Sequence, residues 1–263
     1  MRTLWRWLAL LPIVFAIAAS CDPADDTKGL YIALGDSLSE GAGASDPRAT
    51  GFVPLVHQSL GDGHALLNLG HSGDTSDDLG SHGHLDDAVA EIERRNGDDD
   101  AGNDVTLVTL EIGGNDLLRL YFSLVLTGRC PDVESSINDP ECTEPLGEAF
   151  DNFEPNLAAA LDALQAADPS LRILLLTLFN PLPEDSATAP VGDLALEGMP
   201  DTPFEEGLND IVRRQAEQHA VTVAETYDPF QDRGDELISG DQIHPNDDGY
   251  RIIADAVIAA LGK

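Results

Sequence analysis

Basic residues are scarce in this chain of 263 residues. Lysine and arginine number 14 against 48 aspartates and glutamates, which gives a formal net charge of −34. A negative field of this size repels polyanions, so nucleic acid is not expected as a partner. The charge is compatible with a salty environment, but an Asp-rich surface on a lysine-poor chain explains it as well, and the composition does not choose between the two.

The N-terminus lacks an apolar run long enough to cross a membrane. The uncharged stretch from Trp7 to Ala19, preceded by Arg2 and Arg6, is shorter than the roughly 20 residues that a spanning helix needs. Positive charge followed by a short apolar segment is typical of an export signal. We therefore expect residues 1–20 to be a leader rather than a membrane anchor.

Cysteine occurs three times, and the first copy follows the leader. Ala18-Ala19-Ser20-Cys21 resembles the lipobox of bacterial lipoproteins, in which the cysteine is lipidated, although its first position holds alanine where leucine is usual. Ala16-Ile17-Ala18 is an ordinary cleavage site, so the protein is expected to be either a lipid-anchored protein of the cell envelope or a plainly secreted one.

If Cys21 is used for lipidation, the two remaining cysteines are Cys130 and Cys142. In an oxidising setting they are expected to form a disulfide, with two buried thiols as the alternative.

No internal repeat or second set of motifs divides the chain, so one domain is expected. Residues 21–28 are polar, as a tether would be, and residues 29–263 are long enough for a single core. Strand-like apolar runs alternate with helical patterns, which predicts a three-layer α/β/α fold with a five-stranded parallel sheet in the flavodoxin-like order 2-1-3-4-5. The expected strands, which we predict to be buried on both faces, are Leu30–Leu34, Ala65–Leu69, Val105–Ile112, Arg172–Leu178 and Val221–Ala224. The expected helices are Phe52–Leu60, Leu79–Arg95, Leu146–Ala167, Phe204–Ala220 and Asn246–Leu261.

Two motifs at opposite ends of the chain supply the parts of a serine hydrolase. Gly35-Asp36-Ser37-Leu38 follows the first expected strand, and Asp241-Gln242-Ile243-His244-Pro245 precedes the last helix. A serine hydroxyl becomes a good nucleophile when an imidazole takes its proton, and a carboxylate on the other ring nitrogen orients that imidazole. These residue types predict Ser37 as nucleophile, His244 as base and Asp241 as the residue that orients the base.

Two further turns complete a pattern known from one family. Asn68-Leu69-Gly70-His71-Ser72-Gly73-Asp74-Thr75 follows the second strand, and Gly113-Gly114-Asn115-Asp116 follows the third. With the two motifs above, the chain resembles the SGNH, or GDSL-type, esterases and lipases from about Leu30 to its C-terminus. The resemblance implies Ser37 as nucleophile, the Asp241/His244 pair as base, and an oxyanion hole formed by the Ser37 N–H, the Gly73 N–H and the Asn115 amide. Each turn alone is usually a strand end or a helix start, but four in this order favour catalysis.

The stretch after the third motif is the best indication of the substrate. Leu117–Leu126 is strongly apolar and is followed by the segment between the two remaining cysteines. It is expected to form an acyl-binding wall or lid, with Leu118, Leu120 and Tyr121 as substrate-binding residues, or else an ordinary buried helix. The expected partners are therefore small-molecule or lipid esters, and the membrane if Cys21 is lipidated; the oligomeric state cannot be read from the sequence.

Neither a metal nor another cofactor is expected from the motifs. His82-Gly83-His84 with Asp86 and Asp87 lacks a recognisable ligand spacing and is typical of a polar turn before a helix. Asp98-Asp99-Asp100 lacks the EF-hand pattern and fits a solvated loop.

Taken together, these patterns predict an exported serine esterase that acts through an acyl-enzyme on lysophospholipids, acylglycerols or acetylated carbohydrates. An acyltransferase and a non-catalytic ligand-binding envelope lipoprotein are the alternatives.

Overall fold

The computed structural model describes residues 28–183 and 186–262. The expected leader at residues 1–20, the expected lipidation site Cys21 and all of the tether except residue 28 lie outside the described residues. Within the described ranges, no helix combines the length and the apolar character needed to cross a membrane.

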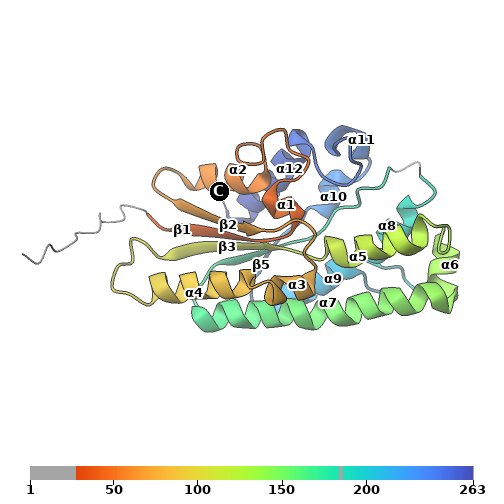
Figure 1. The fold of residues 1–263 in the computed structure, drawn as a ribbon, viewed down its shortest axis with the longest axis horizontal. Helices are drawn as coiled ribbons and strands as arrows, with labels where there is room; N and C mark the ends of the chain where they lie inside the picture. Colours follow the sequence, from red (N-terminus) through yellow and green to blue (C-terminus); the bar gives the residue numbers. More distant parts are fainter. Residues whose placement is uncertain (1–27, 184–185, 263) are drawn as a thin grey trace, which may run out of the picture.

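Five parallel strands form one sheet in the order β2-β1-β3-β4-β5, which confirms the predicted topology (Figure 1). The interior strand β1 is buried along its whole length, as expected for a strand with helices over both faces. The edge strands β2 and β5 are only partly buried, because each has a neighbour on one side, so the expectation of full burial is wrong for these two strands. The strands are β1 Leu30–Gly35, β2 Ala65–Gly70, β3 Val105–Glu111, β4 Ile173–Leu176 and β5 Thr222–Ala224.

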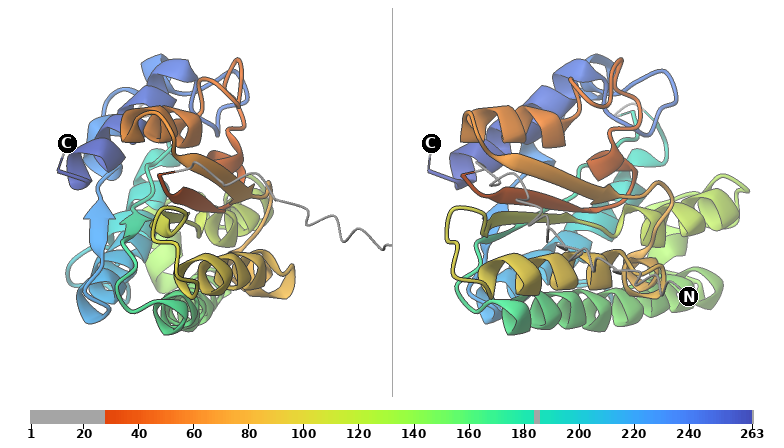
Figure 2. Two further views of the ribbon diagram at one scale, coloured as in Figure 1. Left: turned by 90° about the vertical axis from the view of Figure 1, so that its left-hand side faces the viewer. Right: turned by 60° about the vertical axis from the view of Figure 1, so that its left-hand side comes forward.

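Helices cover both faces of the sheet (Figure 2). Tyr31 and Ala33 of β1 point to a core layer shared with α2 and α12, whereas Leu30, Ile32 and Leu34 point to a layer shared with α4, α7 and α9. This alternation is the period of two that a strand imposes on its side chains. The helices are α1 Ser37–Glu40, α2 Phe52–Leu60, α3 Ser76–Ser81, α4 His84–Asn96, α5 Gly114–Leu120, η1 Tyr121–Val125 (a π-helical turn), α6 Val133–Asn138, α7 Pro140–Ala167, α8 Ala189–Glu197, α9 Leu208–Gln218, α10 Tyr227–Phe230, α11 Gly234–Leu237 and α12 Asp247–Ala260.

The segment expected to form one helix over Leu79–Arg95 forms two, so that prediction is wrong. A capping box at Thr75 and Asp78 starts α3 before the expected position. Gly83 then takes a left-handed conformation with φ of 85°, which ends the first helical segment and starts α4 in a new direction. The break leaves His82 and His84 at the junction of the two helices.

The helix α7 also begins earlier than the expected Leu146. Pro140 occupies its first turn, where a missing N–H costs nothing, and Asp139 caps it by accepting from the Glu141 N–H. Apolar side chains along one side of this helix enter the core, among them the buried Phe153 and Leu157. The helix therefore extends beyond the sheet, toward the segment that follows β3 (Figure 1).

Gly35, the last residue of β1, is a position where the fold requires glycine. Its φ is 147°, and a Cβ atom there would lie 2.1 Å from the carbonyl oxygen of Glu111 on β3.

Backbone strain of about 1–3 kcal/mol and overpacking of about 1–3 kcal/mol should lower the unfolding free energy of Gly35→Ala by about 2–6 kcal/mol. Denaturant unfolding measures this loss. Gly147→Ala, in α7 with no atom within 4 Å of the added Cβ, is the matched control and should not be destabilised; equal stability of both variants would contradict the argument.

Candidate active site

Ser37 lies just after the interior strand β1, at the carboxyl edge of the sheet. It is the first residue of α1, and Asp36 caps this helix by accepting from the Leu38 N–H at 3.0 Å. As the first residue of the helix, Ser37 has an N–H that no helical carbonyl can pair. The side chain is 8% exposed, so its hydroxyl is reached through a cavity rather than from open solvent.

The structure brings His244 and Asp241 to Ser37 across more than two hundred residues. His244 Nε2 lies 2.9 Å from Ser37 Oγ, and His244 Nδ1 lies 2.7 Å from Asp241 Oδ2. The second oxygen of Asp241 accepts from the backbone N–H groups of His244 and Ile243 and from the hydroxyl of Ser239. Burial alone would raise the pKa of Asp241, but these hydrogen bonds hold it below its usual range. The carboxylate is therefore ionised and fixed against the imidazole.

The loop between α1 and α2 holds the His244 loop in place. A Cβ on Gly43 would lie 2.7 Å from the Cβ of His244, so only glycine permits this close approach. The Asp247 carboxylate accepts from the Ser45 N–H and hydroxyl, at 2.8 and 2.5 Å, and from the Thr50 hydroxyl at 2.8 Å. These contacts bind the start of α12, and with it the preceding histidine, to the chain that follows Ser37.

The two other expected oxyanion donors lie on the loops that follow β2 and β3. Gly73 is exposed, has a φ of 89°, and its N–H donates to no group within the described part of the chain. The Nδ2 atom of Asn115 already has two acceptors, the backbone oxygen of Asp74 at 2.9 Å and Oδ2 of Asp36 at 3.1 Å. Asn115 therefore touches the cap of the serine helix on one side and the Gly73 turn on the other.

Sequence reasoning missed a pair of buried carboxyls beneath this site. Glu111, the last residue of β3, is 1% exposed, and neither of its carboxyl oxygens has a hydrogen-bond partner among the described residues. Burial and the neighbouring charge of Asp36 raise the pKa of Glu111 well above its usual range, and burial raises the pKa of Asp36 to about 6. A protonated Glu111 can donate to the Asp36 carboxylate. The signal in the sequence was an acidic residue at the end of an otherwise apolar strand.

An apolar cavity opens beside Ser37 and His244. Leu118, Leu120 and Tyr121, the expected substrate-binding residues, all line it. The opposite wall was not anticipated: it comes from the segment after β4 and from α8, and its members are Leu178, Phe179, Pro181, Leu182, Val191, Ala195 and Leu196. Part of this wall is anchored by Asn209, whose buried amide bonds both the N–H and the carbonyl of Leu178.

A disulfide joins Cys130 and Cys142, the pair that the sequence singled out, with a Cα separation of 5.9 Å. Both cysteines line the same cavity, so the bridge belongs to its wall. The helix α5 and the turn η1 between β3 and the bridge contain no fully buried residue. This segment is therefore not the ordinary buried helix that was the alternative reading of Leu117–Leu126.

Fold and site together define a serine ester hydrolase of the α/β type. The sequence model of the GDSL-like lipase/acylhydrolase family matches residues 33–252, so the chain belongs to this family. No curated protein sequence matches the chain.

Solved structures share the fold at low sequence identity. A lipase, Lip_vut3 from a goat rumen metagenome, is 20% identical with a TM-score of 0.61, over 88% of this chain and 96% of the other. An extracellular lipase from Streptomyces rimosus is 18% identical with a TM-score of 0.60, over 88% and 99%. The salicylyl-acyltransferase SsfX3 from a tetracycline biosynthetic pathway is 21% identical with a TM-score of 0.53, over 90% and 55%. At these identities the likeness concerns the fold.

The buried carboxyl pair predicts how stability depends on pH. Unfolded Asp36 and Glu111 have ordinary pKa values, whereas in the folded state both pKa values are raised. The folded protein therefore binds more protons than the unfolded one once the pH exceeds the ordinary carboxyl range, and its unfolding free energy should fall as the pH rises through about 6, the folded pKa of Asp36, and above it. Glu111→Gln should make this fall shallower, because one group whose pKa is raised in the folded state is removed and an amide can donate to Asp36.

Urea unfolding at several pH values measures the slope of stability against pH. Glu134→Gln is the matched control, because Glu134 is an exposed residue of α6. An unchanged slope in Glu111→Gln would show that the pair does not hold a proton in the folded state.

Proposed function

We propose that the protein hydrolyses carboxylic esters through an acyl-enzyme formed on Ser37. The observation that carries this proposal is the continuous chain of contacts from Ser37 Oγ to His244 Nε2 at 2.9 Å and from His244 Nδ1 to Asp241 at 2.7 Å. This arrangement has the same roles as the Ser-His-Asp template. Membership in a family of lipases and acylhydrolases supports the same chemistry.

His244 acts first as a base and then as an acid. Its Nε2 takes the Ser37 proton as Oγ attacks the ester carbonyl, and the same proton then passes to the leaving alcohol. Asp241 holds the proton on Nδ1, so that Nε2 offers its lone pair to the serine, and it stabilises the imidazolium that forms. Water then attacks the acyl-enzyme with His244 again as base, which releases the acid and restores the serine.

The tetrahedral intermediate places an oxyanion near the N–H groups of Ser37 and Gly73 and the amide of Asn115. The N–H groups of Ser37 and Gly73 are supported as donors, because neither donates to another group in the part of the chain that the structure describes. Asn115 contributes if its longer contact, to Asp36 at 3.1 Å, gives way to the oxyanion. Loss of one such donor typically lowers turnover about 10²- to 10³-fold.

The serine assignment is tested with a fluorophosphonate probe, which forms a covalent bond with an activated serine. Wild type should be labelled with parallel loss of p-nitrophenyl acetate hydrolysis, whereas Ser37→Ala should take no label and lose about 10³-fold or more of its turnover. Ser170→Ala is the matched control, because Ser170 precedes β4 at the opposite end of the sheet. Labelling of Ser37→Ala at the wild-type rate would end the proposal.

The cavity supports esters with an apolar acyl chain as the substrate class. Its walls are largely leucine, valine and aromatic side chains. Lysophospholipid or acylglycerol esters therefore fit this site better than acetylated carbohydrates, whose short acyl group would leave the cavity unfilled. Transfer of the acyl group to another acceptor uses the same intermediate, and analysis of the products with and without an added alcohol separates it from hydrolysis.

Leu118 offers a clean test of the acyl cavity, because it lines the cavity but is not packed into a core cluster, unlike Leu120. Removing a leucine contact worth about 1.5 kcal/mol should lower kcat/KM for an octanoyl ester about tenfold in Leu118→Ala and leave the acetyl ester unchanged. Leu126→Ala, exposed and outside the cavity, is the control. Equal losses for both esters would refute an acyl-binding role for this wall.

Export is part of the same proposal. A disulfide persists in oxidising compartments, and the bridge between Cys130 and Cys142 supports a location outside the cytosol. The leader and Cys21 supply the route, either as a lipoprotein of the cell envelope or as a secreted enzyme.

A further inference from the structure

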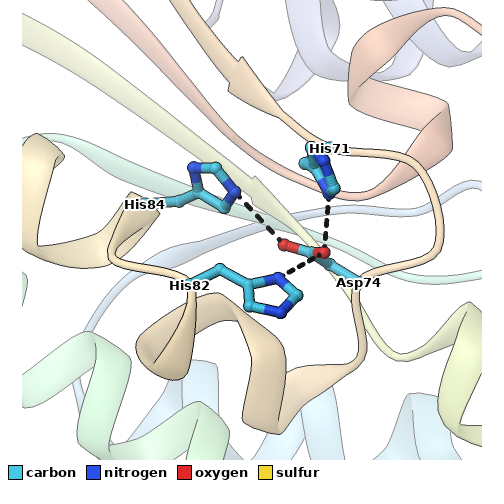
Figure 3. A group of neighbouring side chains, drawn as sticks. All are labelled: His71, Asp74, His82 and His84. Carbon is cyan, nitrogen blue, oxygen red and sulfur yellow. Dashed lines mark hydrogen bonds and ion pairs between the residues drawn. The ribbon is translucent and has the colours of Figure 1, made fainter.

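Three histidines and an aspartate point toward one another near the end of β2 (Figure 3). His71 and Asp74 belong to the turn after β2, His82 follows α3, and His84 is the first residue of α4. One nitrogen or oxygen atom from each of these four residues lies within 4.8 Å of the others. The break between α3 and α4, which the sequence did not predict, turns both of the later histidines toward the turn.

Asp74 is the centre of this cluster and is incompletely satisfied by it. Its side chain is 2% exposed. Oδ1 accepts from His71 Nδ1 at 2.8 Å and from His82 Nδ1 at 2.9 Å, whereas the buried Oδ2 has no hydrogen bond to any described residue and lies 3.5 Å from His84 Nε2. A buried carboxylate oxygen without a hydrogen-bond partner costs free energy. Three imidazole rings surround this carboxylate, but only two of them form a hydrogen bond with it.

We propose that His71, Asp74, His82 and His84 bind a zinc ion. Three imidazole nitrogens and one carboxylate oxygen make a four-ligand set of the kind that zinc takes, and the ring nitrogens that face Asp74 would give their lone pairs to the metal. The ion would stand between the carboxylate and the rings, so that each contact to Asp74 becomes a shared bond to the metal. Because all four protein ligands are used, the ion has a structural role rather than a catalytic one.

The sequence predicted no metal here because only half of the ligand set is visible in one stretch. His82-Gly83-His84 has no partner at a usual spacing along the chain, and the missing ligands come from the turn after β2. The proximity depends on the parallel sheet and on the helix break at Gly83. The zinc proposal does not depend on the assignment of Ser37, so each can fail without the other.

Bound zinc would fix the turn that carries Gly73. This glycine lies between the two ligands His71 and Asp74, and the backbone oxygen of Asp74 accepts from Asn115 at 2.9 Å. Two expected oxyanion donors are therefore attached to the cluster, one by the chain and one by a hydrogen bond. Zinc would act on the reaction without touching the substrate, through the position of these donors and the charge beside them.

The test is equilibrium dialysis of the purified protein against zinc in the presence of excess magnesium, followed by metal analysis. Magnesium occupies weak sites on the acidic surface, so the remaining zinc reports the nitrogen-rich site. One zinc per chain is expected, with an increase in Tm on zinc addition. A stoichiometry far below one, or zinc displaced by magnesium, would overturn the proposal.

Variants locate the bound ion. His84→Gln and the double variant His82→Gln/His84→Gln should weaken zinc binding at least about 10- to 100-fold, the loss typical of removing even an outer partner of a metal site. His64→Gln is the matched control, because His64 lies before β2, at the opposite end of that strand. Zinc binding by the double variant equal to that of the wild type would overturn the proposal.

A measurement on the wild type covers the case in which the variants do not fold. X-ray absorption at the zinc edge should show four ligands, mostly imidazole nitrogen at about 2.0–2.1 Å. A spectrum of oxygen ligands alone would place the ion on surface carboxylates and contradict the proposed site.

Discussion

The register of β1 against its two neighbours determines where every group of the candidate site lies. Gly35 stands opposite Gly70 of β2 and Glu111 of β3, so the chain leaves all three strands at one level. The serine helix, the Gly73 turn and the Asn115 helix therefore start side by side at one edge of the sheet. A slip of one residue would exchange the two faces of a strand and remove both core layers at once, which is why the register is strongly specified.

The histidine depends on a different kind of constraint, because no strand delivers it. Its loop is closed locally by the bridge between Ile238 and Pro245 and by the Ser239 N–H, which donates to the His244 carbonyl at 2.7 Å. Tyr250 of α12 then reaches the loop after α1 through its hydroxyl, which donates to the Ala42 carbonyl at 2.5 Å. The position of the base relative to the serine is therefore set by contacts between two loops, each attached to a helix on the same face of the sheet.

The sequence predicted what periodicity and turn chemistry determine. The strand order, the helix over Phe52–Leu60 and the convergence of Ser37 with His244 followed from patterns within single segments and from a resemblance. The sequence did not predict the features that depend on contacts between several segments. The wall from Leu178 to Leu182 has no local signature, because Asn209 of α9, 31 residues after Leu178, holds its start in place. The cluster of His71, Asp74, His82 and His84 was not predicted for the same reason, since its two halves are neighbours in space and not along the chain.

The placement of negative charge connects the buried acids with the chemistry. Among the described acidic residues, Asp36, Asp74 and Glu111 are the buried ones, and Asn115 donates to the side chain of the first and to the backbone of the second. Ionised carboxylates beside a forming oxyanion would oppose it, because Coulomb repulsion is weakly screened in a buried site. A proton held between Asp36 and Glu111 removes charge on one side of Asn115, and zinc on Asp74 would do so on the other. In a chain with a net charge of −34, neutralising these few buried acids is what would keep the oxyanion donors effective.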